Sequence, residues 1–300
     1  MSMNWMAVIF HNIHSCEQVV RDFMEDGCVY LELRTTPKDR PEHGMSKASY
    51  VEAVLEGLKP YQSLQGLRYD NQEGDTSDEN RSAADADEEK HLSILVKLIL
   101  SIDRREGSEE AMNTVMLAAQ YPGIVVGIDL SGNPTVGCWS QWRDALIKAR
   151  QLGLKIAVHA AEVYAPEETA AILDFAPDRL GHMCKLNAEL EAKLLDSKIP
   201  VELCLTSNLK TKTVDTYADH HFAQLYGAGC PVVLCTDDSG FFDTSLTREY
   251  AIAMQVFSLS SGNIFQLVEG SFEFLFCNEE EKMHVVHFAR GKLHKMSADT

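Results

Sequence analysis

The stretch Ile156-Ala157-Val158-His159-Ala160-Ala161-Glu162 reads as an apolar strand that ends in a histidine and a glutamate. Two other segments end in a similar way: Arg179-Leu180-Gly181-His182 and Val232-Val233-Leu234-Cys235-Thr236-Asp237-Asp238. Continuous Val, Ile and Leu runs are typical of buried parallel strands, and catalytic residues gather at the C-terminal ends of such strands. The three strand ends therefore predict a single active site.

Strand-like runs alternate with amphipathic stretches along most of the 300 residues. The expected strands cover residues 28–34, 94–102, 125–130, 156–159, 179–181, 200–205 and 231–235. The expected helices cover residues 17–25, 49–58, 109–119, 141–152, 167–175, 188–197, 245–257 and 279–293. This alternation predicts βα units and a parallel sheet. We expect an α/β fold, a single TIM-type (β/α)8 barrel domain over residues 1–300 whose first strand is missing.

One segment, at about residues 70–90, interrupts this pattern. It is rich in Asp, Glu, Ser, Asn and Ala and has almost no large apolar residue. We expect a disordered, solvated acidic insertion, with an acidic docking segment as the alternative.

The bulk composition excludes some classes of function. The formal charge of −18 argues against nucleic-acid binding, which needs a basic surface, but a local basic cluster could still bind a small anion. The eight cysteines form no C-x-x-C pair and are expected to be reduced. No stretch approaches the roughly 20 apolar residues of a membrane span. We expect a cytoplasmic monomer that binds neither membranes nor nucleic acids.

Each strand end has a functional interpretation and a plainer one. His159 beside Glu162 suits a zinc ligand next to a general acid or base, although Glu162 could be a solvated residue of a helix start. Adjacent carboxylates at Asp237 and Asp238 need a positive partner such as a metal, but they could also be a helix cap and its solvated neighbour. His182 could be a hydrogen-bonded residue of the rim.

Two further strand ends carry polar residues. Asp129-Leu130-Ser131-Gly132 follows a predicted strand, and its glycine would let the backbone approach a ligand closely. Thr206-Ser207-Asn208 follows another, and its polar groups could belong to the site or could only satisfy a turn.

In chain order, the ends His-Ala-Ala-Glu, Gly-His, Leu-Thr-Ser-Asn and Thr-Asp-Asp resemble those of the adenosine/AMP deaminase family. The resemblance runs from about Phe10 to about residue 290, and residues 30–37, 127–132 and 202–208 support it. Within the family, the chain is most similar to the adenosine deaminase-like subgroup, which acts on N6-substituted AMP.

The resemblance implies a barrel of the metal-dependent hydrolase kind with one zinc ion at its C-terminal rim. It implies that His159 ligates the zinc and that Asp237 completes the metal site. Glu162 would protonate the purine ring nitrogen, His182 would activate or orient the zinc-bound water, and Asp238 would hold the attacking hydroxide or a purine nitrogen. The implied substrate-binding residues, besides Asp238, are Asp129 and Gly132 in the base pocket, Thr36 and Lys38 at a phosphate, and His14.

The chain departs from the family at its first strand, because it contains no His-x-His motif. A catalytic zinc usually has three protein ligands, and only His159 and Asp237 are strong candidates. The helical pairs His11/His14 and His284/His287 are not expected to substitute. We expect an incomplete or alternatively started gene product, with a zinc-free derivative as the alternative. Either would leave unpaired strand edges near residues 29 and 233, bind zinc weakly and deaminate poorly.

The leading hypothesis is a zinc-dependent hydrolytic deaminase of adenine nucleotides or nucleosides, most specifically one that converts N6-methyl-AMP to IMP and methylamine. The alternatives are adenosine deaminase proper, a catalytically dead nucleotide-binding protein of the same fold, and another metal-dependent barrel hydrolase. The segment from Asp129 to Gly132 favours a purine pocket over the last of these. Lys38 favours monophosphates over nucleosides.

Overall fold

The computed structural model describes residues 5–64, 67 and 94–298. The chain forms two compact units: residues 34–37 and 98–276 make up unit 2, and the other described residues make up unit 1. The acidic segment predicted at about residues 70–90 lies outside the described residues, and its disorder stays a prediction. A single barrel domain over the whole chain likewise stays a prediction.

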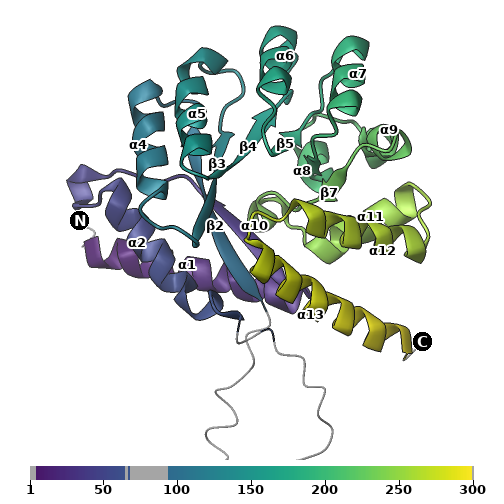
Figure 1. Cartoon of the computed structure of the whole chain (residues 1–300), viewed down its shortest axis with the longest axis horizontal. Coiled ribbons are helices and arrows are strands. Elements are labelled where there is room, and N and C mark those ends of the chain that lie inside the picture. The colour runs from purple at the N-terminus through teal and green to yellow at the C-terminus, as the bar shows by residue number, and fades with distance from the viewer. Residues whose placement is uncertain (1–4, 65–66, 68–93, 299–300) are drawn as a thin grey trace, which may run out of the picture. The chain divides into compact units, whose positions relative to one another are not determined.

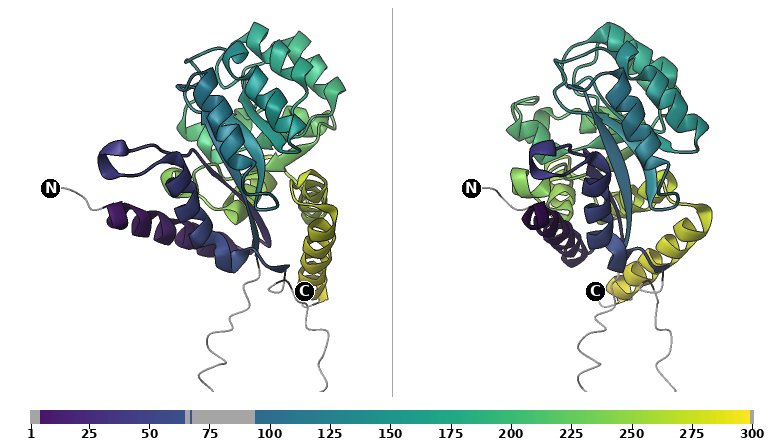
Figure 2. Two further views of the ribbon diagram at one scale, coloured as in Figure 1. Left: turned by 60° about the vertical axis from the view of Figure 1, so that its left-hand side comes forward. Right: turned by 90° about the vertical axis from the view of Figure 1, so that its left-hand side faces the viewer.

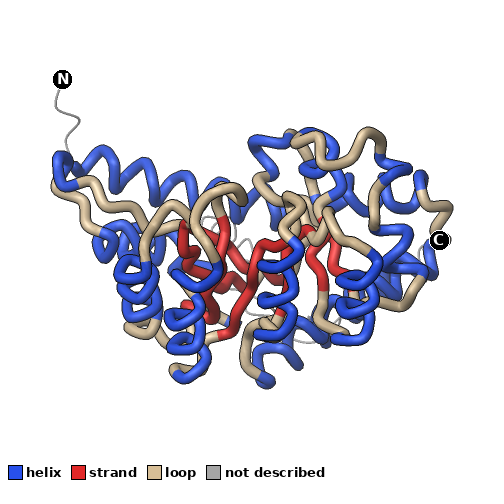
Figure 3. The backbone as a smooth tube through the Cα atoms, turned by 90° about the horizontal axis from the view of Figure 1, so that it is seen from above, coloured by secondary structure: helices blue, strands red, loops and turns tan. Residues whose placement is uncertain are grey.

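The seven described strands form one sheet in the order of the chain, from β1 to β7. From β2 onward each strand pairs in parallel with the next. The sheet curls as a half-barrel, which confirms the predicted α/β class (Figure 3). In the described sheet β1 and β7 are the end strands. The strands are β1 (Tyr30–Thr35), β2 (Leu95–Asp103), β3 (Val125–Ser131), β4 (Lys155–Ala160), β5 (Arg179–His182), β6 (Val201–Leu203) and β7 (Val232–Leu234).

Helices cover the outer side of the unit 2 strands, which explains the apolar runs of those strands (Figure 1). All nine residues of β2 are buried, as a strand covered on both faces requires. Ile99, Ala157 and Phe276 pack together in one cluster of the core. The covering helices are α4 (Ser108–Ala118), α5 (Arg143–Gln151), α6 (Pro166–Phe175) and α7 (Ala188–Ser197), and the short helix η4 (Trp139–Gln141) precedes α5.

The later part of unit 2 contains more helix than the sequence patterns predicted. Only α11 (Leu246–Val256) was expected in this region. Thr206, Ser207 and Asn208 lie in a helical turn that starts directly after β6, rather than in a loop. The additional helices are α8 (Leu205–Lys210), η5 (Tyr217–Asp219), α9 (Phe222–Gly227), α10 (Ser239–Phe242), α12 (Ser261–Ser271) and η6 (Phe272–Phe274).

Unit 1 contains the first and last helices of the described chain. α1 (Trp5–Glu25) packs against α2 (Lys47–Leu58), and Figure 2 shows the two side by side. A capping box between Ser46 and Ser49 begins α2. The short helices η1 (Pro41–His43) and η2 (Lys59–Tyr61) flank α2, and α13 (Glu279–Ala298) ends the described chain.

Two further properties bear on the predictions from composition. All eight cysteines are free thiols. None of the helices in the described residues has both the length and the apolar character that a membrane crossing needs.

Candidate active site

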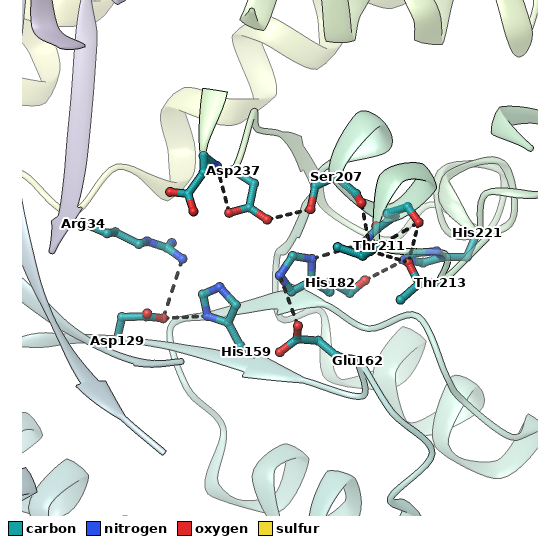
Figure 4. A network of polar contacts seen from close by, with 12 residues as sticks. Arg34, Asp129, His159, Glu162, His182, Ser207, Thr211, Thr213, His221 and Asp237 are labelled. Carbon is teal, nitrogen blue, oxygen red and sulfur yellow. Dashed lines mark hydrogen bonds and ion pairs between the residues drawn. The ribbon is translucent and has the colours of Figure 1, made fainter. Parts of the chain in front are cut away.

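Polar side chains converge at the C-terminal ends of the unit 2 strands (Figure 4). The first centre is His159 on β4, whose Nδ1 lies 3.0 Å from Oδ1 of Asp129 on β3. The other oxygen of Asp129 accepts a hydrogen bond of 3.1 Å from Ser101 Oγ. Asp129 is 1% exposed, so this carboxylate holds the His159 ring in place from inside the sheet.

The electrostatics of this pair follow from its burial and its charges. Burial lowers the pKa of His159, but the charge and hydrogen bond of Asp129 outweigh that effect and raise it to about 9. Burial favours the neutral acid at Asp129, yet His159 and Arg34 hold its pKa well below the ordinary value. Without a metal, the pair is therefore an imidazolium and a carboxylate at neutral pH.

Three charged residues that the sequence analysis did not select lie next to this pair. Arg34 Nη1 lies 3.6 Å from Asp129 Oδ1, and its Nη2 hydrogen-bonds both oxygens of Glu202 on β6. Arg179 Nε lies 2.9 Å from Glu202 Oε1, and its guanidinium stacks 3.5 Å from the ring centroid of Phe276. The two cations lower the pKa of the buried Glu202 despite the opposing effect of burial. Glu202 is thus an ion-pair partner and not a free acid.

His182, the last residue of β5, forms the second centre. Its ring centroid lies 4.9 Å from that of His159, and its Nε2 lies 4.0 Å from Glu162 Oε2. Burial and the neighbouring charge of His159 lower the pKa of His182 to about 4, so its imidazole is neutral. Burial raises the pKa of Glu162 above its ordinary value. A neutral imidazole therefore faces a carboxyl group that holds its proton to a higher pH than usual.

The adjacent aspartates follow β7. Ser207 Oγ donates to Asp237 Oδ2 at 2.7 Å, and the backbone N–H of Asp238 donates to Asp237 Oδ1 at 2.9 Å. Asp238 precedes α10 but its side chain makes no capping hydrogen bond, which argues against the plainer interpretation as a helix cap. Burial, followed by the charge of Asp237, raises the pKa of Asp238. Both residues keep part of their surface in solvent and can meet a ligand.

Within the described residues, one group of three could hold a metal ion, with ligand atoms that all lie within 4.8 Å of one another: His182, Cys204 and Asp237. Imidazole, thiolate and carboxylate all suit zinc. A hydrogen bond with Cys235 and burial, however, raise the pKa of the Cys204 thiol well above its ordinary value. Two of these residues were candidates from the sequence; Cys204 was not.

The hydrogen-bond partners separate the two histidines as zinc ligands. A metal-bound histidine normally donates its other ring N–H to an acceptor. His159 Nδ1 faces the carboxylate of Asp129, which is such an acceptor. His182 Nδ1 faces the side-chain amide nitrogen of Asn208 at 3.4 Å, which is a donor. The partner of His159 Nδ1 therefore suits a zinc ligand, whereas that of His182 Nδ1 does not.

The predicted substrate-binding residues are divided between the two units. Gly132 has a φ of 103°, and a Cβ there would lie 2.8 Å from Asp103 Oδ1, so the close approach at this glycine is made by Asp103. Thr36 is half-buried just after β1 in unit 2. His14 and Lys38 belong to unit 1, and their roles at the site stay predictions.

Comparisons with known proteins agree with this constellation. A family model described as adenosine deaminase matches residues 13–288. The N6-mAMP deaminase of Arabidopsis thaliana is 46% identical over 269 residues, which cover 89% of this chain and 74% of that protein. The human N6-methyl-AMP deaminase is 37% identical over 277 residues, 89% of this chain and 71% of that protein. A solved ADAL–IMP complex is 41% identical with a TM-score of 0.81, and the match covers 96% of this chain and 78% of the other. The resemblance in the strand ends is thereby confirmed, and the chain is an aminohydrolase that belongs to the adenosine deaminase family.

Proposed function

We propose that this chain hydrolyses N6-methyl-AMP to IMP and methylamine. The observation that carries the proposal is the pairing of a neutral His182 with Glu162, a carboxyl group of raised pKa, 4.0 Å away. The names of the relatives supply the substrate, because two of them are N6-methyl-AMP deaminases and one solved structure is a complex with IMP.

The reaction replaces the C6–N bond of the purine by a C6–O bond. Water adds to C6 while the ring nitrogen next to it gains a proton, and the amine then leaves with a proton as C6 becomes a carbonyl. Glu162 would give the ring nitrogen its proton, since a carboxyl group whose pKa is raised by burial can act as an acid near neutral pH. His182 would orient the attacking oxygen, and Asp238 would accept a hydrogen bond from that oxygen or, when protonated, donate one to a purine ring nitrogen.

The zinc that the family resemblance implies would be held by His159 and Asp237. When bound, zinc supplies a Lewis acid that makes water nucleophilic at neutral pH. Both oxygens of Asp129 are already engaged by His159 and Ser101. We therefore assign Asp129 first to the orientation of His159, and only second to the base pocket beside Gly132.

The phosphate of the substrate is assigned to the segment after β1. Thr36 offers a hydroxyl at the end of that strand, and Lys38 offers a positive charge two residues later. A monophosphate should therefore be a better substrate than a nucleoside.

A substrate panel with added zinc tests the proposal. IMP and methylamine are measured by liquid chromatography and mass spectrometry after incubation with N6-methyl-AMP, AMP, N6-methyladenosine and adenosine. We expect slow turnover of N6-methyl-AMP, with a kcat/KM at least about tenfold above that of N6-methyladenosine, the effect of one charge-assisted phosphate contact. Equal values for the two would contradict the phosphate assignment.

The second candidate is a nucleotide-binding protein without catalysis. It is favoured by one observation: the group of three that could hold a metal in the described residues is His182, Cys204 and Asp237, and the amide donor at His182 Nδ1 and the raised pKa of the Cys204 thiol both disfavour zinc there. Calorimetric binding of IMP, with no turnover of any purine in the presence of zinc, would support this candidate and overturn the first.

A further inference from the structure

Two adjacent histidines lie behind the site and take no part in the proposed chemistry. His220 and His221 connect η5 to α9, and their rings stack with centroids 4.3 Å apart and an interplanar angle of 17°. His220 is 2% exposed and His221 is half-buried. His220 is connected to His182 through the side chain of Asn208, and His221 hydrogen-bonds His182 directly.

The first bond fixes the proton of His220. The backbone N–H of Phe222 points to His220 Nδ1 at 3.0 Å. A backbone N–H can only donate, so Nδ1 must accept and cannot carry a proton. Burial lowers the pKa of His220 to about 3, which agrees with a neutral ring. The single ring proton of His220 is therefore on Nε2.

The second bond fixes the orientation of an amide. His220 Nε2 lies 2.9 Å from Asn208 Oδ1, and since Nε2 carries the proton, the atom of Asn208 that faces it must be the oxygen. The backbone carbonyl of Asn208 accepts from Thr213 N at 3.0 Å and from Thr213 Oγ1 at 2.8 Å, which anchors the residue. The amide NH2 of Asn208 is thereby turned toward His182.

The third bond reaches the site. Asn208 Nδ2 lies 3.4 Å from His182 Nδ1, so that nitrogen accepts and carries no proton, which places the ring proton on Nε2. His182 Nε2 is the atom that faces Glu162. His221 acts on the backbone of the same residue, because its Nε2 donates to the His182 carbonyl at 2.6 Å. His182 has a φ of 64°, a conformation that few non-glycine residues adopt.

We propose that His220 is a positioning residue that, through Asn208, keeps the ring proton of His182 on Nε2, toward Glu162. The consequence for catalysis rests on the proposed function: His182 presents an N–H donor to the attacking oxygen in every turnover. The same polarity withholds His182 from metal binding, since ligation through Nε2 would need the proton on Nδ1, where Asn208 already donates. His221 holds the strained backbone and does not set the tautomer.

The tautomer can be read without substrate or metal. In protein labelled with 15N-histidine, protonated and unprotonated ring nitrogens have widely separated chemical shifts, and His182→Gln assigns the His182 signals. We expect Nε2–H in the native protein. In His220→Phe the amide of Asn208 is no longer fixed, and His182 should populate both tautomers. In His220→Gln the side-chain amide can still donate to Asn208, and the native tautomer should return.

Asn208→Asp gives the opposite test and does not depend on whether His220→Phe folds. A carboxylate accepts from both neighbours, so His182 Nδ1 should become protonated. His221→Phe is the matched control: it keeps an aromatic ring in the stack and should leave the His182 proton on Nε2. Nδ1–H in the native protein, or an unchanged Nε2–H tautomer in Asn208→Asp, would overturn the proposal.

Kinetics connect this inference to the reaction. We expect kcat for N6-methyl-AMP to fall about tenfold in His220→Phe with KM changed less than about twofold, and to recover in His220→Gln, because only part of the contribution of a positioned proton donor is lost. If the native protein turns over no purine but the tautomer shifts as expected, the proposed function fails and the positioning role stands. If turnover is normal and the tautomer does not respond to these variants, the positioning role fails alone.

Discussion

His159 and His182 lie at the C-terminal ends of neighbouring parallel strands, and their ring centroids are 4.9 Å apart, yet their surroundings give them opposite properties. The pKa of His159 is raised to about 9, and that of His182 is lowered to about 4. Burial lowers the pKa of both rings, so burial does not cause the difference. The difference comes from the neighbouring charges: the carboxylate of Asp129 raises the pKa of His159, and the charge of His159 in turn lowers the pKa of His182.

This contrast divides the site into two halves with different chemistry. The half around His159 and Asp129 is charged and has the polarity of a metal ligand with its supporting carboxylate. The half around His182 and Glu162 is built from a neutral ring and a carboxyl group of raised pKa, which suits proton transfer. Two identical side chains can therefore hold different roles because of the charges and hydrogen-bond partners around each ring.

The largest effect on activity is expected from a change in the half of the site around His182 and Glu162, which suits proton transfer. Glu162→Gln removes the acid and keeps the shape of the side chain, so kcat/KM for N6-methyl-AMP should fall by roughly 10²- to 10⁴-fold, the usual contribution of a general acid. Glu167→Gln, in the exposed first turn of α6, is the control and should be neutral. A loss of less than about tenfold in Glu162→Gln would remove the acid role from this residue.

A smaller effect is expected from the half that binds metal. Asp129→Asn removes the charge that raises the pKa of His159, so this pKa should fall from about 9 to below the ordinary value near 6.5. Zinc affinity, measured by calorimetry, should fall by roughly 10- to 100-fold, as for other residues that support a ligand. NMR titration of His159 measures the pKa directly.

Asp144→Asn, at an exposed carboxylate of α5, is the control for this change in charge. An unchanged His159 pKa in Asp129→Asn would show that the contrast between the two histidines has another cause. Normal zinc affinity together with a lowered pKa would remove His159 from the metal site and leave the electrostatic argument intact.

The sequence predicted the strands well, and for a physical reason. The β4 strand was expected at residues 156–159 and covers Lys155–Ala160, because the fully buried Ile156, Ala157 and Val158 form a continuous apolar run. The short helices α8 and α9 were not predicted, since six residues are too few to show a helical period. The start of α12 did carry a signal in the capping box of Ser260 and Asn263, which the sequence analysis missed.

The site was only partly predictable because its residues act in pairs. The strand ends supplied His159, Glu162 and His182, each visible as a polar residue after an apolar run. Arg34 and Glu202 carried no such signal, since they meet across 168 positions of sequence and lie inside strand motifs that were used only to recognise the family. The contact from His220 to Asn208 is closer in sequence, but a hydrogen bond between two side chains leaves no periodic pattern.

The smallest expected effect lies in the stability of the fold in mild acid. His220 and His182 have folded pKa values of about 3 and about 4, below the ordinary value of 6.5. At a pH between each folded pKa and 6.5, the unfolded chain binds more protons than the folded chain. The free energy of unfolding therefore falls as pH falls below 6.5. Each such histidine contributes a slope of up to about 1.4 kcal/mol per pH unit. His159 has the opposite sign, because its stabilising contribution is present below pH 6.5 and is lost as pH rises through about 9.

Urea denaturation from pH 5 to pH 6.5 measures this slope above the range in which most carboxylates titrate. His220→Gln should make the slope shallower by up to about 1.4 kcal/mol per pH unit, because glutamine does not titrate. His284→Gln, on an exposed histidine of α13, should leave it unchanged. An unchanged slope in His220→Gln would mean that His220 is not held neutral in the fold. The Phe222 N–H would then no longer place the His220 proton on Nε2, and the tautomer assigned to His182 through Asn208 would fail with it.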